Sequence, residues 1–204
     1  MPDGPLSLPA RLCLLAWDAD PSRQAPVVRA GALAELARRG LLTDDDGIAT
    51  PLDLDSRTGD PVLDGLLELV AESRPHRWRV WVTLHARYTL DAVREQLVAE
   101  GVLRAEKHRV LGLFPSMEHV VSDARRFRSL RRDARDILAA PPETVPESTA
   151  TALTLALAAG ILAPPDTRPL PHHTTTPAPA YAAILHELRT ALAASSLGFS
   201  ASGV

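Results

Sequence analysis

One segment near the middle of the chain limits the fold most strongly, because it joins a helix directly to a hairpin. In LVAEGVLRAEKHRVLGLFP, residues 97–115, a helical pattern ends at Gly101 and the residues after it suit a short hairpin. Glycine favours the left-handed conformation that closes many helices. A similar unit comes earlier, where ARRGLLTDDDGI passes Gly40 and then Asp46-Gly47, a strong hairpin-turn signal. The sequence therefore predicts two helix, glycine and hairpin units.

The remaining segments mostly carry helical periodicity. The chain of 204 residues is 46% hydrophobic but only 4% aromatic, and its abundance of Ala and Leu favours helices over a β-sandwich. Apolar residues recur at spacings of three and four, which is typical of helices that face a core. Helices are expected at Leu8–Asp18, from Pro26 to Gly40, from Pro61 to Val70, at Arg77–Arg87, from Leu90 to Glu100 with Thr89 as its cap, at Val121–Ala139, at Ala150–Leu162 and from Tyr181 to Leu192.

One of these helices is expected at the centre. Ala150–Leu162 is apolar nearly all round, which is typical of a helix surrounded by others. The predicted fold class is mainly α, a central buried helix bundle wrapped by amphipathic helices, with short β-hairpins after Gly40 and Gly101. A single domain is expected over residues 1–196, with a proline-rich loop at 163–179 and a flexible tail at 197–204.

Charge and cysteine content narrow the class of protein. A formal net charge of -3 gives no global attraction to nucleic acid or anionic lipid, so such a partner requires a local basic patch. Cys13 is the only cysteine, which excludes an internal disulfide and a cysteine-based zinc cluster. The longest apolar run, residues 150–165, is shorter than the roughly 20 residues that cross a bilayer. Lys107 is the only lysine, and this bias towards arginine favours a bacterial source.

The sequence carries no motif of the common enzyme classes. A phosphate-binding loop, a G-x-S-x-G elbow and an H-E-x-x-H helix are all missing, so no catalytic role and no cofactor is expected. His172 and His173 are adjacent in an extended loop without further ligands nearby, so no metal site is expected there. The aspartates of residues 44–46 lack the ligand spacing of a calcium loop and suit a turn.

The strongest binding signal is a basic helix face. The helix Val121–Ala139 is amphipathic, with Phe127, Leu130, Ala134 and Ile137 on one side and Arg125, Arg128, Arg132 and Arg135 on the other. Guanidinium groups along one stripe can pair with phosphates. Asp123, Asp133 and Asp136 lie on the same helix and could instead neutralise these arginines locally. The sequence leaves open whether the face is merely solvated or binds an anion.

Three blocks, VVRAGALAELARRGLL, TGDPVLDGLLELV and LVAEGVLRAEKHRVLGLFP, resemble the Golgi phosphoprotein 3 family of phosphoinositide-binding proteins in order and spacing. The resemblance extends more loosely through Ala150–Leu162. It implies a mostly helical fold with a buried central bundle. It also implies a noncatalytic adaptor that binds the phosphatidylinositol 4-phosphate headgroup on a shallow basic surface and binds cytoplasmic tails of membrane enzymes.

The resemblance also locates a headgroup site. The family uses a Trp, an Arg before the first long helix, and two Arg ahead of the apolar central helix. Arg29 falls on the first of these arginines, whereas the Trp position falls near Asp20 and the arginine pair near Thr144 and Glu147. Each missing charge-assisted bond removes about 1.5–3 kcal/mol, so headgroup binding there is expected to be weakened or lost. The family's projecting hairpin, used for self-association and membrane contact, would fall at residues 163–174.

The expected function is therefore that of a noncatalytic, cytoplasmic adaptor, peripheral on the cytoplasmic membrane face. Its expected partners are phosphatidylinositol 4-phosphate or another anionic lipid and the protein tails of membrane enzymes, and its expected headgroup residues are Arg29, Arg125, Arg128 and Arg132. The alternative is a winged-helix-like regulator that binds nucleic acid. Its recognition helix would be Leu90–Glu100, which offers only Arg94 against three acidic residues, so nucleic acid is not expected as a partner.

Overall fold

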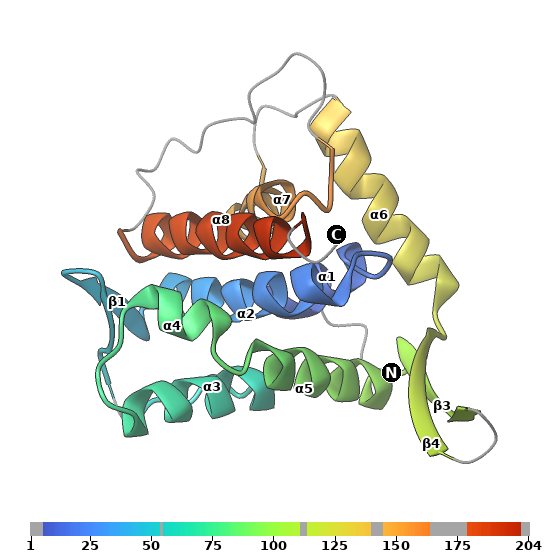
Figure 1. The fold of residues 1–204 in the computed structure, drawn as a ribbon, viewed down its shortest axis with the longest axis horizontal. Helices are drawn as coiled ribbons and strands as arrows, with labels where there is room; N and C mark the ends of the chain where they lie inside the picture. Colours follow the sequence, from blue (N-terminus) through green and yellow to red (C-terminus); the bar gives the residue numbers. More distant parts are fainter. Residues whose placement is uncertain (1–5, 54, 111–113, 140–144, 164–178, 201–204) are drawn as a thin grey trace.

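The computed structural model describes residues 6–53, 55–110, 114–139, 145–163 and 179–200. Within these ranges it is mainly helical, with two separate two-stranded antiparallel sheets, as the sequence predicted (Figure 1). The elements are α1 Leu8–Leu15, α2 Pro21–Arg38, β1 Leu42–Asp45, β2 Ile48–Pro51, α3 Pro61–Glu72, α4 Trp78–Thr83, α5 Ala86–Ala99, β3 Leu103–Val110, β4 Phe114–Val121, α6 Ala124–Ala139, α7 Glu147–Ala158 and α8 Pro179–Ser200.

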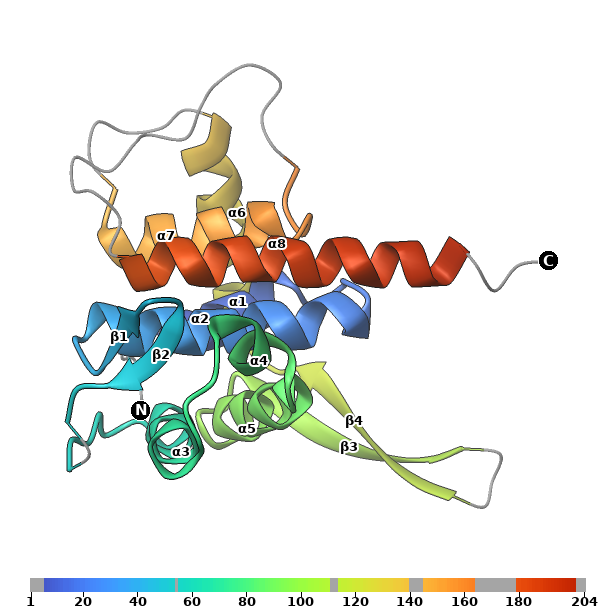
Figure 2. The same cartoon turned by 60° about the vertical axis from the view of Figure 1, so that its left-hand side comes forward.

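The helix at the centre is α2, not the predicted Ala150–Leu162. Figure 2 shows α2 between a layer formed by α7 and α8 and a layer formed by α3 and α5, and α2 contacts all four of these helices. Its small residues let neighbours approach closely: a Cβ added to Gly31 would overlap the Leu12 side chain of α1. By contrast, α7 leaves Thr154 and Leu157 half-exposed. The predicted hub is therefore a flanking helix.

Helix starts depend on capping that the sequence only partly revealed. Asp60 caps α3 as expected, because its carboxylate accepts hydrogen bonds from the backbone N–H groups of Val62 and Leu63 at 2.9 and 3.2 Å. The expected start at Pro26 is wrong. Instead, α2 begins at Pro21 behind an Asp20 cap, and Pro26 lies inside the helix.

The start of α5 also differs from the expected one. This helix begins at Ala86 after His85, which has a left-handed φ of 53°. Thr89 is therefore a buried residue of the first helical turn and does not cap the helix.

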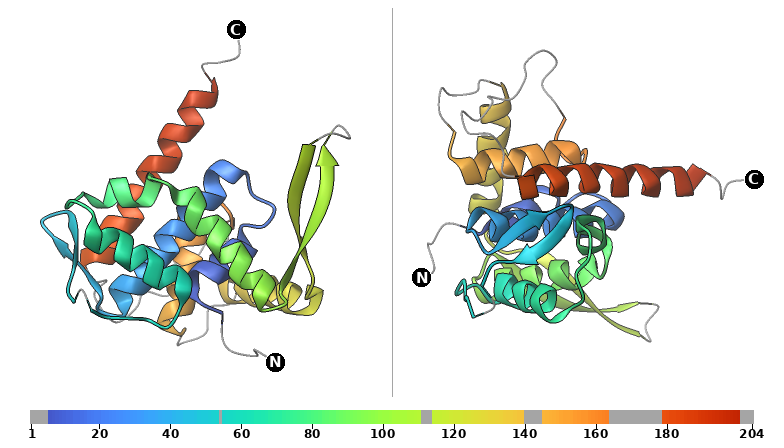
Figure 3. Two further views of the ribbon diagram at one scale, coloured as in Figure 1. Left: turned by 90° about the horizontal axis from the view of Figure 1, so that it is seen from below. Right: turned by 90° about the vertical axis from the view of Figure 1, so that its left-hand side faces the viewer.

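Both predicted hairpins are present and they differ in size. In the first, Asp45 pairs with Ile48 across Asp46 and Gly47, whose φ angles of 49° and 83° suit a two-residue type I′ turn. In the second, β3 and β4 each span eight residues, so it is longer than expected. Figure 3 shows it standing away from the helices. The segment where the family's projecting hairpin was expected lies almost wholly outside the described residues, as does most of the predicted proline-rich loop.

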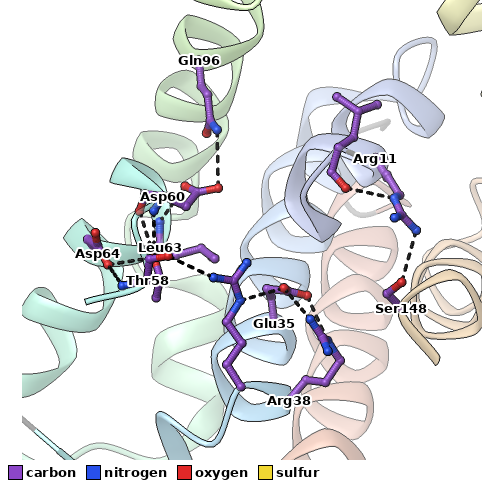
Figure 4. A network of polar contacts seen from close by, with 11 residues as sticks. Arg11, Glu35, Arg38, Thr58, Asp60, Leu63, Asp64, Gln96 and Ser148 are labelled. Atoms are coloured by element: carbon purple, nitrogen blue, oxygen red, sulfur yellow. Dashed lines mark hydrogen bonds and ion pairs between the residues drawn. The ribbon is translucent and has the colours of Figure 1, made fainter. Parts of the chain in front are cut away.

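A buried carboxylate ties the end of α2 to its surroundings (Figure 4). Glu35 is 4% exposed, and its carboxylate accepts hydrogen bonds from Arg38 and Arg39, the shortest at 2.8 Å each. Burial opposes ionisation, but the two guanidinium groups outweigh it and lower the pKa of Glu35. Arg39 also donates to the carbonyl of Thr58, in the segment leading to α3. This network links the end of α2 to the segment that leads into α3.

Candidate functional site

The arginines of α6 form an exposed stripe. The helix contains six arginines and two aspartates. Arg125, Arg128, Arg132 and Arg135 are all exposed and are spaced at intervals of three and four residues, so they lie on one side of the helix. We call these four residues the α6 arginine stripe. Figure 1 shows α6 at the edge of the molecule, where a flat surface can approach it.

The aspartates of this segment do not neutralise the stripe. Asp123 accepts hydrogen bonds from the backbone N–H groups of Arg125 and Arg126, so its carboxylate caps the helix. Asp133 accepts from the Ser129 hydroxyl at 3.4 Å. Within the described ranges no carboxylate lies within 4.0 Å of a stripe guanidinium. Of the two alternatives left open by the sequence, this geometry favours a face with positive charge available to an anion.

The stripe is held to the globule by the opposite side of α6. Ala134 and Leu138 are buried, and Phe127, Leu130 and Ile137 are half-buried against the core. Arg131 forms an ion pair with Asp18 in the connection between α1 and α2, and its guanidinium lies 5.3 Å from the Phe127 ring centroid. These contacts fix which side of α6 faces solvent.

Arg29 does not share this surface. Its side chain is only 2% exposed, in the middle of α2, and its Nη2 donates to the carbonyl of Leu84 at 2.9 Å. Its Nε has no hydrogen-bond partner within the described structure, and burial lowers the pKa of Arg29 to about 10. The structure therefore places the predicted headgroup arginine in the core, where a lipid headgroup cannot reach it without a rearrangement.

The positions where the family's other determinants were expected serve different purposes. Asp20 caps α2, and its exposed carboxylate accepts from the Ser22 N–H at 2.8 Å. Glu147 is the exposed first residue of α7, and Thr144 lies outside the described residues. Among these positions, neither Asp20 nor Glu147 can attract a phosphate.

A second surface feature, a hollow, was missed by sequence reasoning. A hollow of about 350 Å³ lies between the α1–α2 connection, α5 and β4. Its lining includes Trp17, Gln24, Arg94 and His119. Trp17 lies three residues before Asp20, the position where the family's Trp was expected. The α1–α2 connection therefore has a tryptophan, but at a different position. Arg94 is more than 70 residues away from Trp17 in sequence, and no local pattern links them.

The rest of the described surface offers little for other chemistry. A smaller hollow of about 250 Å³ on α3 is lined by Arg57 together with Asp64, Glu68 and Glu72, so the charge of its lining is net negative and does not favour an anion. In the part of the chain that the structure covers, no three His, Cys, Asp or Glu side chains gather where a metal could bind. His172 and His173 lie outside that part. No helix within the described ranges combines the length and apolarity needed to span a bilayer.

The side chains of α5 do not support the winged-helix alternative. Arg87 is exposed, but Asp91 lies 3.8 Å from it, one helical turn away. Arg94 is turned towards α2, where its Nη2 donates to Gln24 Oε1 at 2.7 Å. The exposed side of α5 therefore has no row of free arginines that could read bases.

The comparison with known proteins supplies the family. No individual curated protein is similar enough to this chain to match it. The family model of Golgi phosphoprotein 3 (GPP34) matches residues 8–195, which extends from the first residue of α1 into α8. This chain therefore belongs to the Golgi phosphoprotein 3 family.

Proposed function

We propose that this protein is a noncatalytic peripheral adaptor that binds anionic membrane surfaces through the α6 arginine stripe. The observation that carries the proposal is the row of four exposed guanidinium groups without a carboxylate partner in the described structure. Family membership is compatible with a lipid-binding adaptor role. The partners that it would recruit, by analogy with the family, are cytoplasmic tails of membrane proteins.

The expected strength of binding follows from the number of arginines. Each basic side chain near an anionic membrane contributes about 1 kcal/mol, so the stripe supplies about 4 kcal/mol, roughly a thousandfold in partitioning. This attraction falls with salt, because the Debye length shrinks from about 10 Å at 0.1 M to about 3 Å at 1 M. Binding of this kind is moderate and reversible, and it suits a protein that also needs a second contact to stay on a membrane.

The proposal does not include tight, selective binding of phosphatidylinositol 4-phosphate. Selective recognition of a phosphomonoester requires several donors that converge on one site. Here Arg29 is buried, and Asp20 and Glu147 carry negative charge where the family has an aromatic ring and an arginine. We therefore expect the stripe to respond to the surface charge density of the membrane more than to one headgroup.

Vesicle flotation tests the proposal. The test variant replaces all four stripe arginines with glutamine: Arg125→Gln, Arg128→Gln, Arg132→Gln and Arg135→Gln. The matched control replaces four exposed arginines elsewhere with glutamine, namely Arg57, Arg79, Arg87 and Arg104. The control and the stripe variant therefore have the same net charge. The vesicles contain either phosphatidylcholine alone or phosphatidylcholine with about 30% phosphatidylglycerol, which makes the vesicle surface strongly anionic.

We expect the unmodified protein and the control to float with anionic vesicles at low salt, and the stripe variant to lose nearly all binding. Equal binding by the stripe variant and the control would refute the assignment. The same proteins should be mixed with double-stranded DNA. Saturable DNA binding that depends on the stripe, together with no vesicle binding, would replace the lipid proposal with a nucleic-acid one.

A further inference from the structure

Ser129 is an exposed serine among the arginines of the α6 stripe. Residues three and four positions apart are neighbours on a helix, so Arg125 and Arg132 flank this serine on the exposed side of α6. The Ser129 hydroxyl donates to the carboxylate of Asp133 at 3.4 Å, which is a long hydrogen bond. Asp133 is itself exposed, so the hydroxyl is open to an enzyme that approaches from solvent.

The residues before Ser129 give it a distinctive charge pattern. In ARRFRSLRR, residues 124–132, arginines stand four, three and one positions before the serine. Among all serines and threonines of the sequence, Ser129 alone has an arginine three positions before it. Protein kinases select their substrates partly by charge, and a kinase with carboxylates along its substrate groove favours arginines in such positions. The segment therefore suits an arginine-directed serine kinase.

The part of α6 that carries Ser129 is also the part held less firmly. A kinase needs access to the chain on both sides of the serine, so the helix has to open locally. The buried residues of α6, Ala134 and Leu138, lie in its second half, whereas Phe127 and Leu130 in the first half are only half-buried. Segments with few buried apolar contacts open at a low cost in free energy. Since α6 lies at the edge of the molecule (Figure 1), its first half is accessible to a second protein.

A phosphate on Ser129 would cancel about half of the charge of the stripe. Phosphoserine carries about −1.5 to −2 charges at pH 7 and three strong acceptor oxygens. Arg125 and Arg132 are one helical turn away on either side and can pair with these oxygens. If four arginines favour partitioning to an anionic membrane roughly a thousandfold, the two that remain favour it only about thirtyfold. Phosphorylation should therefore weaken membrane binding about thirtyfold.

We propose that Ser129 is a phosphorylation site whose phosphate neutralises the α6 arginine stripe and so controls its binding to an anionic partner. The Ser129 oxygen attacks the γ-phosphorus of ATP, the bond from that phosphorus to the bridging oxygen breaks, ADP leaves, and the hydroxyl proton passes to a carboxylate base of the kinase. For the identity of the anionic partner, a membrane, the inference rests on the proposed function. Because Ser129 faces the membrane in the bound protein, the kinase acts on the unbound protein.

Phosphate uptake tests the modification site. The folded full chain is incubated with MgATP and the catalytic subunit of cAMP-dependent protein kinase, an arginine-directed enzyme. Mass spectrometry of peptides should locate phosphate at Ser129, and Ser129→Ala should take up none there. Arg126→Gln should slow the uptake about tenfold or more, whereas Arg135→Gln, which lies after the serine, should not. Ser122 is exposed just before α6 without an arginine among the four residues before it, so it should remain unmodified.

The effect on charge is tested with the fully phosphorylated protein. Elution from immobilised heparin reports the charge of the stripe without a membrane, and the phosphorylated protein should elute at lower salt than the unmodified protein. Flotation with the anionic vesicles should fall about thirtyfold after phosphorylation. Ser129→Asp should reduce flotation less, because it adds one charge, and Ser129→Asn should leave it unchanged. Prior binding to anionic vesicles should slow the phosphorylation of Ser129.

The two readouts separate failure of this inference from failure of the proposed function. If the unmodified protein does not float, but Ser129 takes up phosphate and elution from heparin shifts to lower salt, the membrane assignment fails and the phosphorylation site is supported. If the unmodified protein floats and the folded chain takes up no phosphate at Ser129, the inference is overturned while the proposed function stands. Unchanged heparin elution after complete phosphorylation would also overturn it.

Discussion

Arg29 offers a sharp test of the energetics of the core. It is a charged side chain at 2% exposure with one hydrogen bond to a neutral carbonyl and no carboxylate in contact in the described structure. Burial lowers its pKa from the ordinary arginine range to about 10. Each pKa unit corresponds to about 1.4 kcal/mol, so desolvation of the charge costs about 3 kcal/mol.

We predict that Arg29→Met leaves the protein equally stable or stabilises it slightly. The substitution removes the desolvation cost of about 3 kcal/mol and loses a charge-assisted hydrogen bond worth about 1.5–3 kcal/mol. Leu84 is 45% exposed, so water can reach the region of the carbonyl that Arg29 leaves. The net gain should be about 1 kcal/mol or less, a rise in melting temperature of up to about 2–4 °C for a chain of this size.

The assay is urea unfolding followed by circular dichroism, with Arg29→Lys as the control. An ammonium group is more strongly hydrated than a guanidinium, so Arg29→Lys should lose stability where Arg29→Met does not. The folded-state pKa of Arg29 is lowered, so its destabilising effect is fully present below about pH 10 and declines only at higher pH. The difference between the unmodified protein and Arg29→Met should therefore be constant from about pH 6 to 9. A loss of more than about 2 kcal/mol in Arg29→Met would refute this reasoning, because it would show that the buried arginine contributes net stability.

Three further predictions concern the packing of the helices. Glu35→Gln should lower the free energy of unfolding by about 1–3 kcal/mol and no more, because its arginine partners are one-third exposed and can rehydrate. The pKa of Glu35 is lowered in the folded protein, so the difference between the variant and the unmodified protein should shrink as the pH falls below about 4.5. Urea unfolding at several pH values measures this difference. Gly31→Ala should destabilise the protein by about 1–3 kcal/mol, because the added methyl group overlaps Leu12. The control is Gly65→Ala on α3, where the added methyl group meets open space, and it should not destabilise the protein. Thermal unfolding compares the two variants. Asp60→Ala should cost about 1 kcal/mol by removing the α3 cap, whereas Asp60→Asn should restore most of that loss.

The parts of the fold that depend on neighbouring residues were predictable from the sequence. Asp60-Pro61 predicts the start of α3, and Asp46-Gly47 predicts the turn of the first hairpin. Both are local signals, because capping and left-handed turn geometry involve residues only a few positions apart. The fold class followed from the same local patterns. The choice of central helix did not, since two apolar segments compete for that place and only the sum of their distant contacts decides between them.

The candidate site divides in the same way. The stripe on α6 was visible as a helical spacing of arginines, but its neutralisation by aspartates depends on rotamers and capping that the spacing does not determine. The buried Arg29 donates its hydrogen bond to the carbonyl of Leu84, which is 55 residues away, so no local pattern could reveal this contact. The hollow joins Trp17 to Arg94 and His119 from three separate segments, so no local signal could have located it.

The central claim is that α6 lies against the membrane, and the position of a label on the protein tests it most directly. Ser129→Cys places a spin label on the exposed side of α6, and Glu68→Cys places one on exposed α3 as the comparison. Cys13 is buried, and its raised pKa keeps the native thiol unreactive during labelling. On phosphatidylglycerol vesicles, the label at residue 129 should lose access to a water-soluble relaxation agent, while the label at residue 68 should keep it. Continued access at residue 129, with the protein bound to the vesicles, would contradict the account.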